Sequence, residues 1–287
     1  MLSTLETILL AGLLLSLMFA VGLSLKPAEF KSVLQHPKAY LLGIFSQFFW
    51  MPLLAFALTK PLEPSAEMNL ALIIIACAPG GSLSNLYSYF SKGKVSLSIA
   101  LTLSTTVLAL FLMPILMGLY INGMEVGTVV VPYKKVLATL FGSLIPVFVG
   151  MLVGKLWPTK AANLEKWSSR IGLVFLALAI VVWVPRMYQQ IFKGGLRTYL
   201  ILSSLSFLGM FAGLLSAKIL KLSRAECRTL FFEVGTQNAP LAFTIVGLAF
   251  GAEALESYGW LCLLFGAISV GNGFIGVAFF KLWDSRA

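Results

Sequence analysis

The amino-acid sequence predicts an all-α protein that crosses a membrane many times. Of its 287 residues, 59% are hydrophobic and only 11% are charged, and the mean hydropathy is +0.94. Long apolar runs recur along the chain with only brief polar interruptions. Soluble domains do not have this composition, and a segment that contacts lipid has to satisfy its own backbone as a helix. We therefore expect one transmembrane domain over residues 1–287 and no soluble domain.

Apolar runs of about 20 residues, the length that spans a bilayer, predict nine transmembrane helices. The first run is followed by Lys26 and Pro27 without a small-residue cleavage site, so we expect it to be retained rather than removed as a signal peptide. The expected spans are Leu5 to Leu25, Ala39 to Thr59, Leu70 to Phe90, Val95 to Leu119, Val136 to Leu156, Ile171 to Pro185, Tyr199 to Leu220, Leu230 to Phe250 and Tyr258 to Trp283.

The lysines and arginines predict how these helices are oriented. With nine spans, 15 of the 21 basic residues fall on one side and 6 on the other. Because basic loops stay cytoplasmic, we expect the N-terminus outside, the C-terminus in the cytoplasm, and a location in the cell (inner) membrane. The net charge of +10 is explained by these loops and by attraction to anionic lipid head groups, and it needs no nucleic-acid partner.

Glu233 is the one acidic residue that falls well inside a predicted helix. An ionisable side chain at that depth is costly and normally faces a cavity, a partner or an ion, so we interpret it as functional. Two structural alternatives are a permanently neutral carboxyl group and an ion pair with Arg228, about one helical turn away.

Two predicted helices contain residues that interrupt a helix near the middle of the span. They are Cys77 to Asn85 (CAPGGSLSN) and Glu233 to Pro240 (EVGTQNAP), within broken helices at about 70–90 and 230–250. A packed kink is the ordinary explanation for one such break. Two breaks, one in each half (about 1–119 and 132–287), are typical of inverted-repeat transporters, in which unwound backbone and half-helix ends bind ions and substrate.

Several motifs in order make the chain resemble the bile acid:sodium symporter family over nearly its whole length. The most specific are Pro79-Gly80-Gly81 followed by Ser84-Asn85, the stretch from Leu97-Ser98 to Ser104-Thr105, and Glu233-Val234-Gly235 with Gln237-Asn238.

The resemblance implies a core domain with two crossed, discontinuous helices and a panel domain that moves against it. Many bacterial members have ten helices in two inverted repeats, and this chain starts at what would be their second helix. It is therefore similar to the nine-helix form of animal members.

The resemblance also implies two sodium sites and a neighbouring substrate site. The first sodium site would use Ser84, Asn85, Ser98, Thr102 and Glu233. The second would use Gln47, Glu233 and Gln237 with the carbonyl groups of Val234 and Thr236. An organic anion would meet backbone N–H groups near Gly81 and Ser82 and the side chain of Asn238.

Elementary chemistry agrees with these ligand sets. Na⁺ is a hard cation that prefers oxygen ligands, and Ser98 and Thr102 are four residues apart, so they share one helix face. Alternatives remain open, because Gln47 could instead bond a neighbouring helix and hydroxyl groups often bond back to their own helix.

The sequence thus predicts a sodium-coupled symporter of an organic anion that works by alternating access, with two Na⁺ as coupling ions and no cofactor. In some bacterial relatives a His-Asn pair borders the cavity, whereas Gly266 to Asn272 (GAISVGN) stands here. A small acid such as pantoate is therefore as plausible a substrate as a bile acid. The oligomeric state is open, and a monomer is plausible.

Other functions fit the sequence less well. An intramembrane enzyme is not expected, because the only histidine, His36, falls in a loop and Glu233 has no second buried carboxylate beside it. A channel would need repeated pore-lining rings that the sequence lacks. Proton coupling through Glu233 is the alternative within the transporter class, followed by an exporter of related fold.

Overall fold

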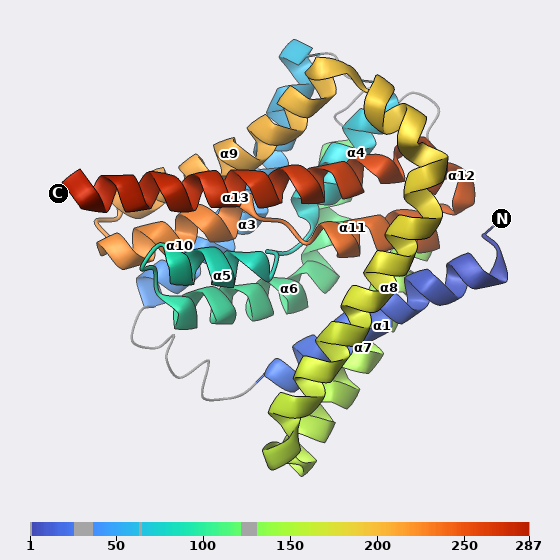
Figure 1. Ribbon diagram of the computed structural model, residues 1–287, viewed down its shortest axis with the longest axis horizontal. Helices are drawn as coiled ribbons and strands as arrows, with labels where there is room; N and C mark the ends of the chain where they lie inside the picture. Colours follow the sequence, from blue (N-terminus) through green and yellow to red (C-terminus); the bar gives the residue numbers. More distant parts are fainter. Residues whose placement is uncertain (1, 26–36, 63–64, 122–130, 287) are drawn as a thin grey trace. The chain divides into compact units, whose positions relative to one another are not determined.

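The computed structural model describes residues 2–25, 37–62, 65–121 and 131–286, and these residues form helices without a β-strand (Figure 1). His36 lies outside the described residues. The elements are α1 (Thr4–Ser24), α3 (Pro37–Leu62), α4 (Ala66–Cys77), α5 (Leu83–Phe90), α6 (Val95–Ile121), α7 (Tyr133–Leu156), α8 (Pro158–Lys193), α9 (Gly195–Ile219), α10 (Arg224–Gly235), α11 (Ala239–Ile245), a π-helical turn (Val246–Phe250), α12 (Ala252–Ala254), a second π-helical turn (Leu255–Gly259) and α13 (Trp260–Arg286).

Within the described ranges, seven helices are long and apolar enough to cross a membrane. They are α1, α3, α6, α7, α8, α9 and the segment Ala252–Ser285 that contains α13. Two shorter apolar helices, Ala66–Cys77 and Ala239–Phe250, fall where the sequence predicted the broken spans. The prediction of an all-helical, multi-pass membrane protein is therefore confirmed.

α8 is much longer than the span predicted at Ile171 to Pro185. It covers 36 residues, and Pro185 lies inside it rather than at its end. Its first turns are polar, so hydropathy does not mark them, although Pro158 is well suited to the first position of a helix. A proline inside a membrane helix is tolerated where neighbouring groups satisfy the freed carbonyl.

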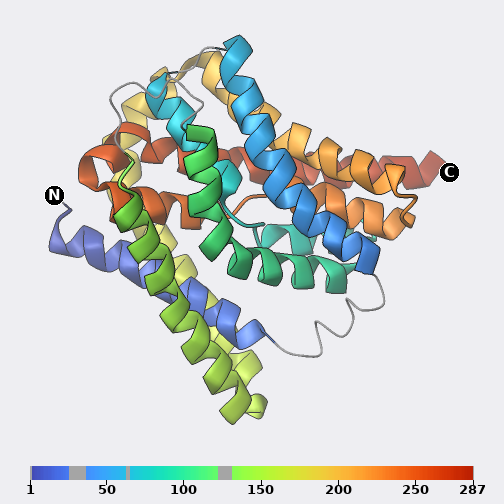
Figure 2. The same ribbon diagram turned by 180° about the vertical axis from the view of Figure 1, so that it is seen from behind.

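The described chain divides into two compact units, of which unit 1 contains Met1–Pro27, Thr128–Lys193 and Pro240–Leu263. Within it α1, α7 and α8 lie side by side (Figure 2). The backbones of α1 and α7 come very close, since a Cβ added at Gly22 would lie 2.1 Å from the carbonyl oxygen of Val147. Glycine at such contacts is a common way for membrane helices to pack.

Unit 2 contains Ala28–Gly127, Gly194–Ala239 and Leu264–Ala287, and it holds all of α3, α5, α6, α9 and α10. α9 and α10 pack backbone to backbone, because a Cβ added at Gly235 would lie 2.6 Å from the carbonyl oxygen of Ser206. The Ser206 hydroxyl also donates to the Gly235 carbonyl over 3.0 Å. These contacts fix the end of α10, where Glu233 lies.

The interruption between α4 and α5 is hydrogen-bonded to the interruption between α10 and α11. The N–H of Gly81 donates to the carbonyl oxygen of Thr236 (2.7 Å), and the N–H of Asn238 donates to that of Pro79 (2.9 Å). Gly80 and Gln237 thereby form an isolated antiparallel bridge. Backbone groups that leave a helix inside a membrane need such partners, and each break supplies them to the other.

Candidate functional site

Glu233 is fully buried on α10, with none of its surface exposed. Its Oε2 accepts hydrogen bonds from the hydroxyl groups of Ser84 on α5 (2.7 Å) and Ser98 on α6 (2.9 Å). Its Oε1 accepts one from Thr102 on α6 (2.7 Å). Three elements thus bring four of the five residues predicted for the first sodium site into direct contact.

Among the described residues, no basic side chain pairs with Glu233. Arg228 bonds instead to the carbonyl oxygen of Ser91 (2.7 Å) and to both carboxylate oxygens of Asp284. Among the described residues, no lysine or arginine lies within 4.0 Å of the Glu233 carboxylate. The alternative of a Glu233–Arg228 ion pair is therefore wrong, and the buried carboxylate needs a proton or an external cation.

The glycines between α4 and α5 let backbone approach this carboxylate. A Cβ added at Gly80 would lie 2.7 Å from Oε1 of Glu233, and one added at Gly81 would lie 2.8 Å from the carbonyl oxygen of Gln237. Since neither position has room for a side chain, the Gly-Gly pair in the sequence has a steric reason.

The residues predicted for the second sodium site form a neighbouring chain of amide contacts. Gln47 on α3 donates from Nε2 to Oε1 of Gln237 (2.7 Å) and to the carbonyl oxygen of Ala78 (3.1 Å). Gln237 donates from Nε2 to the carbonyl oxygen of Val234 (2.9 Å). The carbonyl oxygen of Thr236 accepts the hydrogen bond from the backbone N–H of Gly81.

Several buried oxygens around these groups have no hydrogen-bond partner among the described residues. They are Oδ1 of Asn85, Oε1 of Gln47 and Oγ1 of Thr236. Within the described part of the chain, the three hydrogen bonds of the Glu233 carboxylate come from residues predicted for the first site, and none comes from Gln47 or Gln237. Unpartnered buried oxygens are costly, and hydroxyl, amide, carbonyl and carboxylate oxygens are the ligands that a hard cation prefers.

The residues predicted for the substrate site differ in how accessible they are. Gly81 is buried and its N–H is already bonded to Thr236, so this amide joins the two breaks. Ser82 is exposed directly before α5, and Asn238 is partly buried directly before α11. An anion could therefore reach Ser82 more easily than the Gly81 amide.

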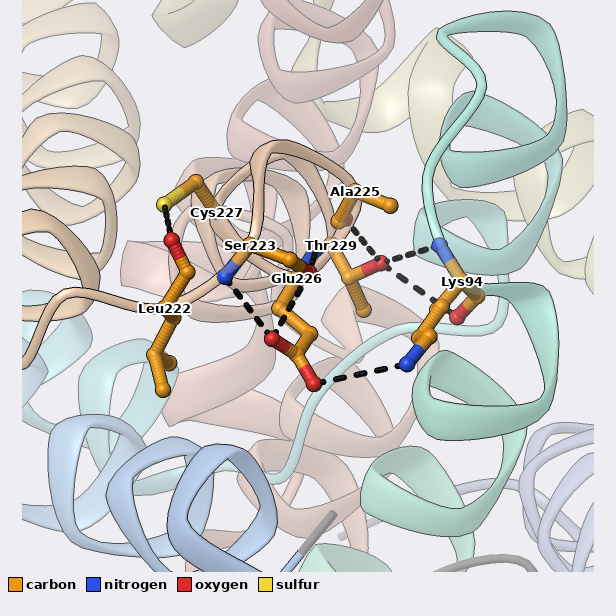
Figure 3. Close-up of polar contacts among 7 residues, drawn as sticks. All are labelled: Lys94, Leu222, Ser223, Ala225, Glu226, Cys227 and Thr229. Atoms are coloured by element: carbon orange, nitrogen blue, oxygen red, sulfur yellow. Dashed lines mark hydrogen bonds and ion pairs between the residues drawn. The ribbon is translucent and has the colours of Figure 1, made fainter. Parts of the chain in front are cut away.

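The start of α10, outside the predicted span that begins at Leu230, is held by a polar network (Figure 3). Ser223 caps the helix, and its backbone N–H donates to the Glu226 carboxylate over 2.9 Å. The other oxygen of Glu226 lies 3.4 Å from Nζ of Lys94. The backbone N–H of Lys94 donates to the Thr229 hydroxyl (2.8 Å). Burial opposes ionisation of Glu226, but the bonds from Ser223 and the nearby Lys94 hold its pKa below the ordinary value.

Two residues of the site were not predicted. The Ala78 carbonyl accepts from Gln47, and a backbone acceptor has no signature in the side-chain sequence. Oγ1 of Thr105 accepts a hydrogen bond from the backbone N–H of Gly80 (3.4 Å), and Thr105 is about one helical turn after Thr102, which was predicted as a ligand. That spacing on one helix face was a usable signal for Thr105.

Comparisons with known proteins show the family of the chain. The model of the "Sodium Bile acid symporter family" matches residues 11–193. The chain is 34% identical to the ileal sodium/bile acid cotransporter of Homo sapiens over 256 residues, which are 89% of this chain and 72% of that protein. It is 30% identical to a sodium-dependent organic anion transporter of Bos taurus over 285 residues, covering 99% and 74% of the two chains.

A third relative, the hepatic sodium/bile acid cotransporter of Homo sapiens, is 29% identical over 97% of this chain and 80% of its own length. The family match ends before α9, but these alignments cover most of the chain. The family and the relatives are transporters and not enzymes. The chain belongs to the sodium bile acid symporter family.

Proposed function

We propose that this chain is a secondary transporter that uses Na⁺ to carry an organic anion across the membrane by alternating access. The observation that carries the proposal is the fully buried Glu233 carboxylate, which is surrounded by three hydroxyl groups and has no basic partner among the described residues. An ion that enters this site would compensate the carboxylate, and the hydroxyl groups would turn their lone pairs to it.

We assign two Na⁺ to the site. The first would bind Glu233 with Ser84, Ser98 and Thr102, and the amide oxygen of Asn85 would complete its ligands. The second would bind between Gln47, Gln237 and the carbonyl groups of Val234 and Thr236, and it would need the Glu233 side chain to turn toward it. The unpartnered Oε1 of Gln47 supports this second assignment.

We further propose that the substrate binds beside the two breaks, near Ser82 and Asn238. The names of the relatives favour a bile acid or another organic anion. A smaller acid such as pantoate remains part of the proposal, because Gly266 to Asn272 lacks the His-Asn pair that borders the cavity in some bacterial relatives.

The architecture that goes with this function is a nine-helix inverted repeat with crossed, broken helices. Unit 2, which holds every predicted ligand, would be the core domain, and α1, α7 and α8 of unit 1 would belong to the panel domain. The N-terminus would lie outside and the C-terminus in the cytoplasm, as the distribution of basic residues favours.

Uptake into proteoliposomes tests the function directly. Labelled taurocholate and labelled pantoate are offered with an inward Na⁺ gradient, an equal K⁺ gradient, or a pH gradient without Na⁺. We expect uptake of at least one anion with Na⁺ only. Equal uptake with Na⁺ and K⁺ would contradict sodium coupling.

Proton coupling is the second candidate, and the full burial of Glu233 without a basic partner among the described residues favours it, because burial disfavours an ionised carboxyl group. Uptake driven by the pH gradient in the absence of Na⁺ would replace the sodium mechanism with this one.

A further inference from the structure

A cavity of about 220 Å³ lies in unit 2, where α9 ends, α10 begins and α13 ends, and its lining includes none of the residues predicted for the sodium and substrate sites. In Figure 1 the start of α10 and the C-terminal end of α13 lie at the same end of this unit. Three of its lining residues are basic: Lys218, Arg224 and Arg228. By the distribution of basic residues, this end faces the cytoplasm.

The three basic residues of this cavity differ in whether a carboxylate pairs with them. Arg228 is buried and paired with Asp284, which also lies 3.3 Å from Lys92. Lys218 and Arg224 are exposed, and no described carboxylate lies within 4.0 Å of either. The cavity therefore presents two uncompensated positive charges.

The rest of the lining is apolar and aromatic. Trp283 and Phe279 are 49% and 39% exposed, Leu222 is partly buried, and Nζ of Lys218 lies 5.5 Å from the centre of the Trp283 ring. Pockets that enclose a whole drug-sized ligand have roughly 300–1,000 Å³. This smaller cavity suits the charged head of a molecule whose apolar remainder lies outside, against exposed side chains at the membrane surface.

The first turn of α10, which carries Arg224, is held in place by polar contacts. The network of Figure 3 holds the first turn of α10, because Ser223 and Lys94 both bind Glu226. Arg224 follows the capping Ser223 directly, so its position is set by the same cap. A prearranged site loses little conformational freedom on binding.

We propose that this cavity binds the head group of an anionic phospholipid, with the phosphodiester between Lys218 and Arg224 and the acyl chains along Trp283 and Phe279. Basic pockets between membrane helices on the cytoplasmic side are suited to such head groups. The proposal depends on the membrane location of the chain but not on its substrate or its coupling ion.

Lipid titration of the purified protein in detergent tests this site. The probes are dioleoylphosphatidylglycerol, dioleoylphosphatidylcholine and glycerol 3-phosphate, and native mass spectrometry counts the bound molecules and gives their affinity. The wild type should bind phosphatidylglycerol more tightly than phosphatidylcholine. Glycerol 3-phosphate should bind weakly, because it lacks the acyl chains.

Two double variants separate the cavity from general surface charge. Lys218→Gln with Arg224→Gln removes two charges inside the cavity, and Lys221→Gln with Lys281→Gln removes two exposed charges outside its lining. At about 1 kcal/mol per basic residue near the lipid surface, the cavity variant should lose roughly 30-fold in affinity for phosphatidylglycerol. The control variant should lose much less.

Three outcomes would overturn the proposal: equal losses in both variants, no preference of the wild type for phosphatidylglycerol, or equally tight binding of glycerol 3-phosphate. The last result would mean a site for a soluble phosphate. If the cavity double variant does not fold, Arg224→Gln alone at its exposed position gives the same comparison with Lys281→Gln. The lipid titration uses no transport substrate, so a negative result in the transport assay with taurocholate or pantoate would not change it. The two proposals can therefore fail separately.

Discussion

Gln47 and Gln237 are hydrogen-bonded to each other across 190 positions of the chain, with 2.7 Å between Nε2 of the first and Oε1 of the second. The pair joins α3 to the break between α10 and α11, and Oε1 of Gln47 has no partner among the described residues. A buried amide oxygen without a hydrogen-bond partner is a ligand that a hard cation prefers.

Replacing Gln47 or Gln237 should therefore remove one sodium ion from the cycle. We expect Gln47→Ala and Gln237→Ala to lower the sodium Hill coefficient of substrate uptake from about two to about one. The partner amide left unpaired in each variant should cost about 1–3 kcal/mol of stability. Gln190→Ala, at an exposed glutamine on α8, serves as the control. A Hill coefficient near two in both ligand variants would contradict the second site.

Removing the charge of Glu233 should stop sodium coupling without unfolding the protein. Glu233→Gln keeps the size of the side chain and its contacts with Ser84 and Thr102 while abolishing the negative charge. We expect Na⁺-dependent uptake to be lost in vesicles that contain normal amounts of the variant. Glu253→Gln, at an exposed carboxylate, should transport normally. Normal uptake by Glu233→Gln would remove Glu233 from the mechanism.

A methyl group at Gly80 should impair cation binding through sterics alone. The Cβ of Gly80→Ala would lie 2.7 Å from Oε1 of Glu233, so the carboxylate or the backbone has to move. We expect Na⁺ to raise the melting temperature of the wild type more than K⁺ does, since ligands that bind the folded state stabilise it. Gly80→Ala should lose this difference.

Gly142→Ala is the matched control for that substitution. A Cβ at Gly142 meets nothing within 4 Å, and alanine favours a helix by about 0.5–1 kcal/mol. The sodium effect should remain in this variant. If Gly80→Ala responded to Na⁺ like the wild type, the Glu233 carboxylate would not be the cation ligand that we propose.

Charge balance predicts that transport is electrogenic. A monovalent anion about 5 Å from an ionised Glu233, at an effective dielectric constant of about 20, would be repelled by roughly 3 kcal/mol, enough to weaken binding more than a hundredfold. Two Na⁺ would offset both charges and carry one net positive charge inward. Uptake in vesicles clamped with K⁺ and valinomycin should accelerate when the inside is negative. Indifference to voltage would mean that a single Na⁺ is coupled.

The pH dependence of stability should report the ionised Glu226 at the start of α10. Its pKa lies below the ordinary value of 4.5, so its stabilising contribution is present above pH 4.5 and is lost as the pH falls through the lower pKa of the folded state. Glu226→Gln keeps a capping residue but cannot titrate. Melting temperatures between pH 6 and pH 3 should fall less steeply for the variant. Identical slopes would contradict the ionised network.

The sequence was informative wherever a residue type is rarely tolerated inside a membrane helix. A proline with two adjacent glycines marked the first interruption, and a glycine, two adjacent amides and a proline marked the second, because such residues are poor in a continuous helix. Glu233 stood out because a buried charge is costly. Ser98 and Thr102 could be paired by their spacing on one face of α6, and they do converge on Glu233.

Other features depend on contacts that are distant in sequence. The alternative of an ion pair between Arg228 and Glu233 was wrong, because Arg228 pairs with Asp284, which is 56 positions away. The start of α8 was missed, since its polar turns carry no hydropathy signal. The π-helical turns on either side of Gly251 also escaped prediction, and its φ of 95° is open to glycine but strained for other residues.

The two backbone bonds between the breaks, from Gly81 to Thr236 and from Asn238 to Pro79, have a consequence for how this site can diverge. Main-chain donors and acceptors do not change when a side chain is replaced. Substitutions around the proposed substrate site can therefore accumulate without releasing the proposed cation ligands on α5 and α10 from one another. A transporter built this way can change the anion that it accepts while it keeps the ion that drives it.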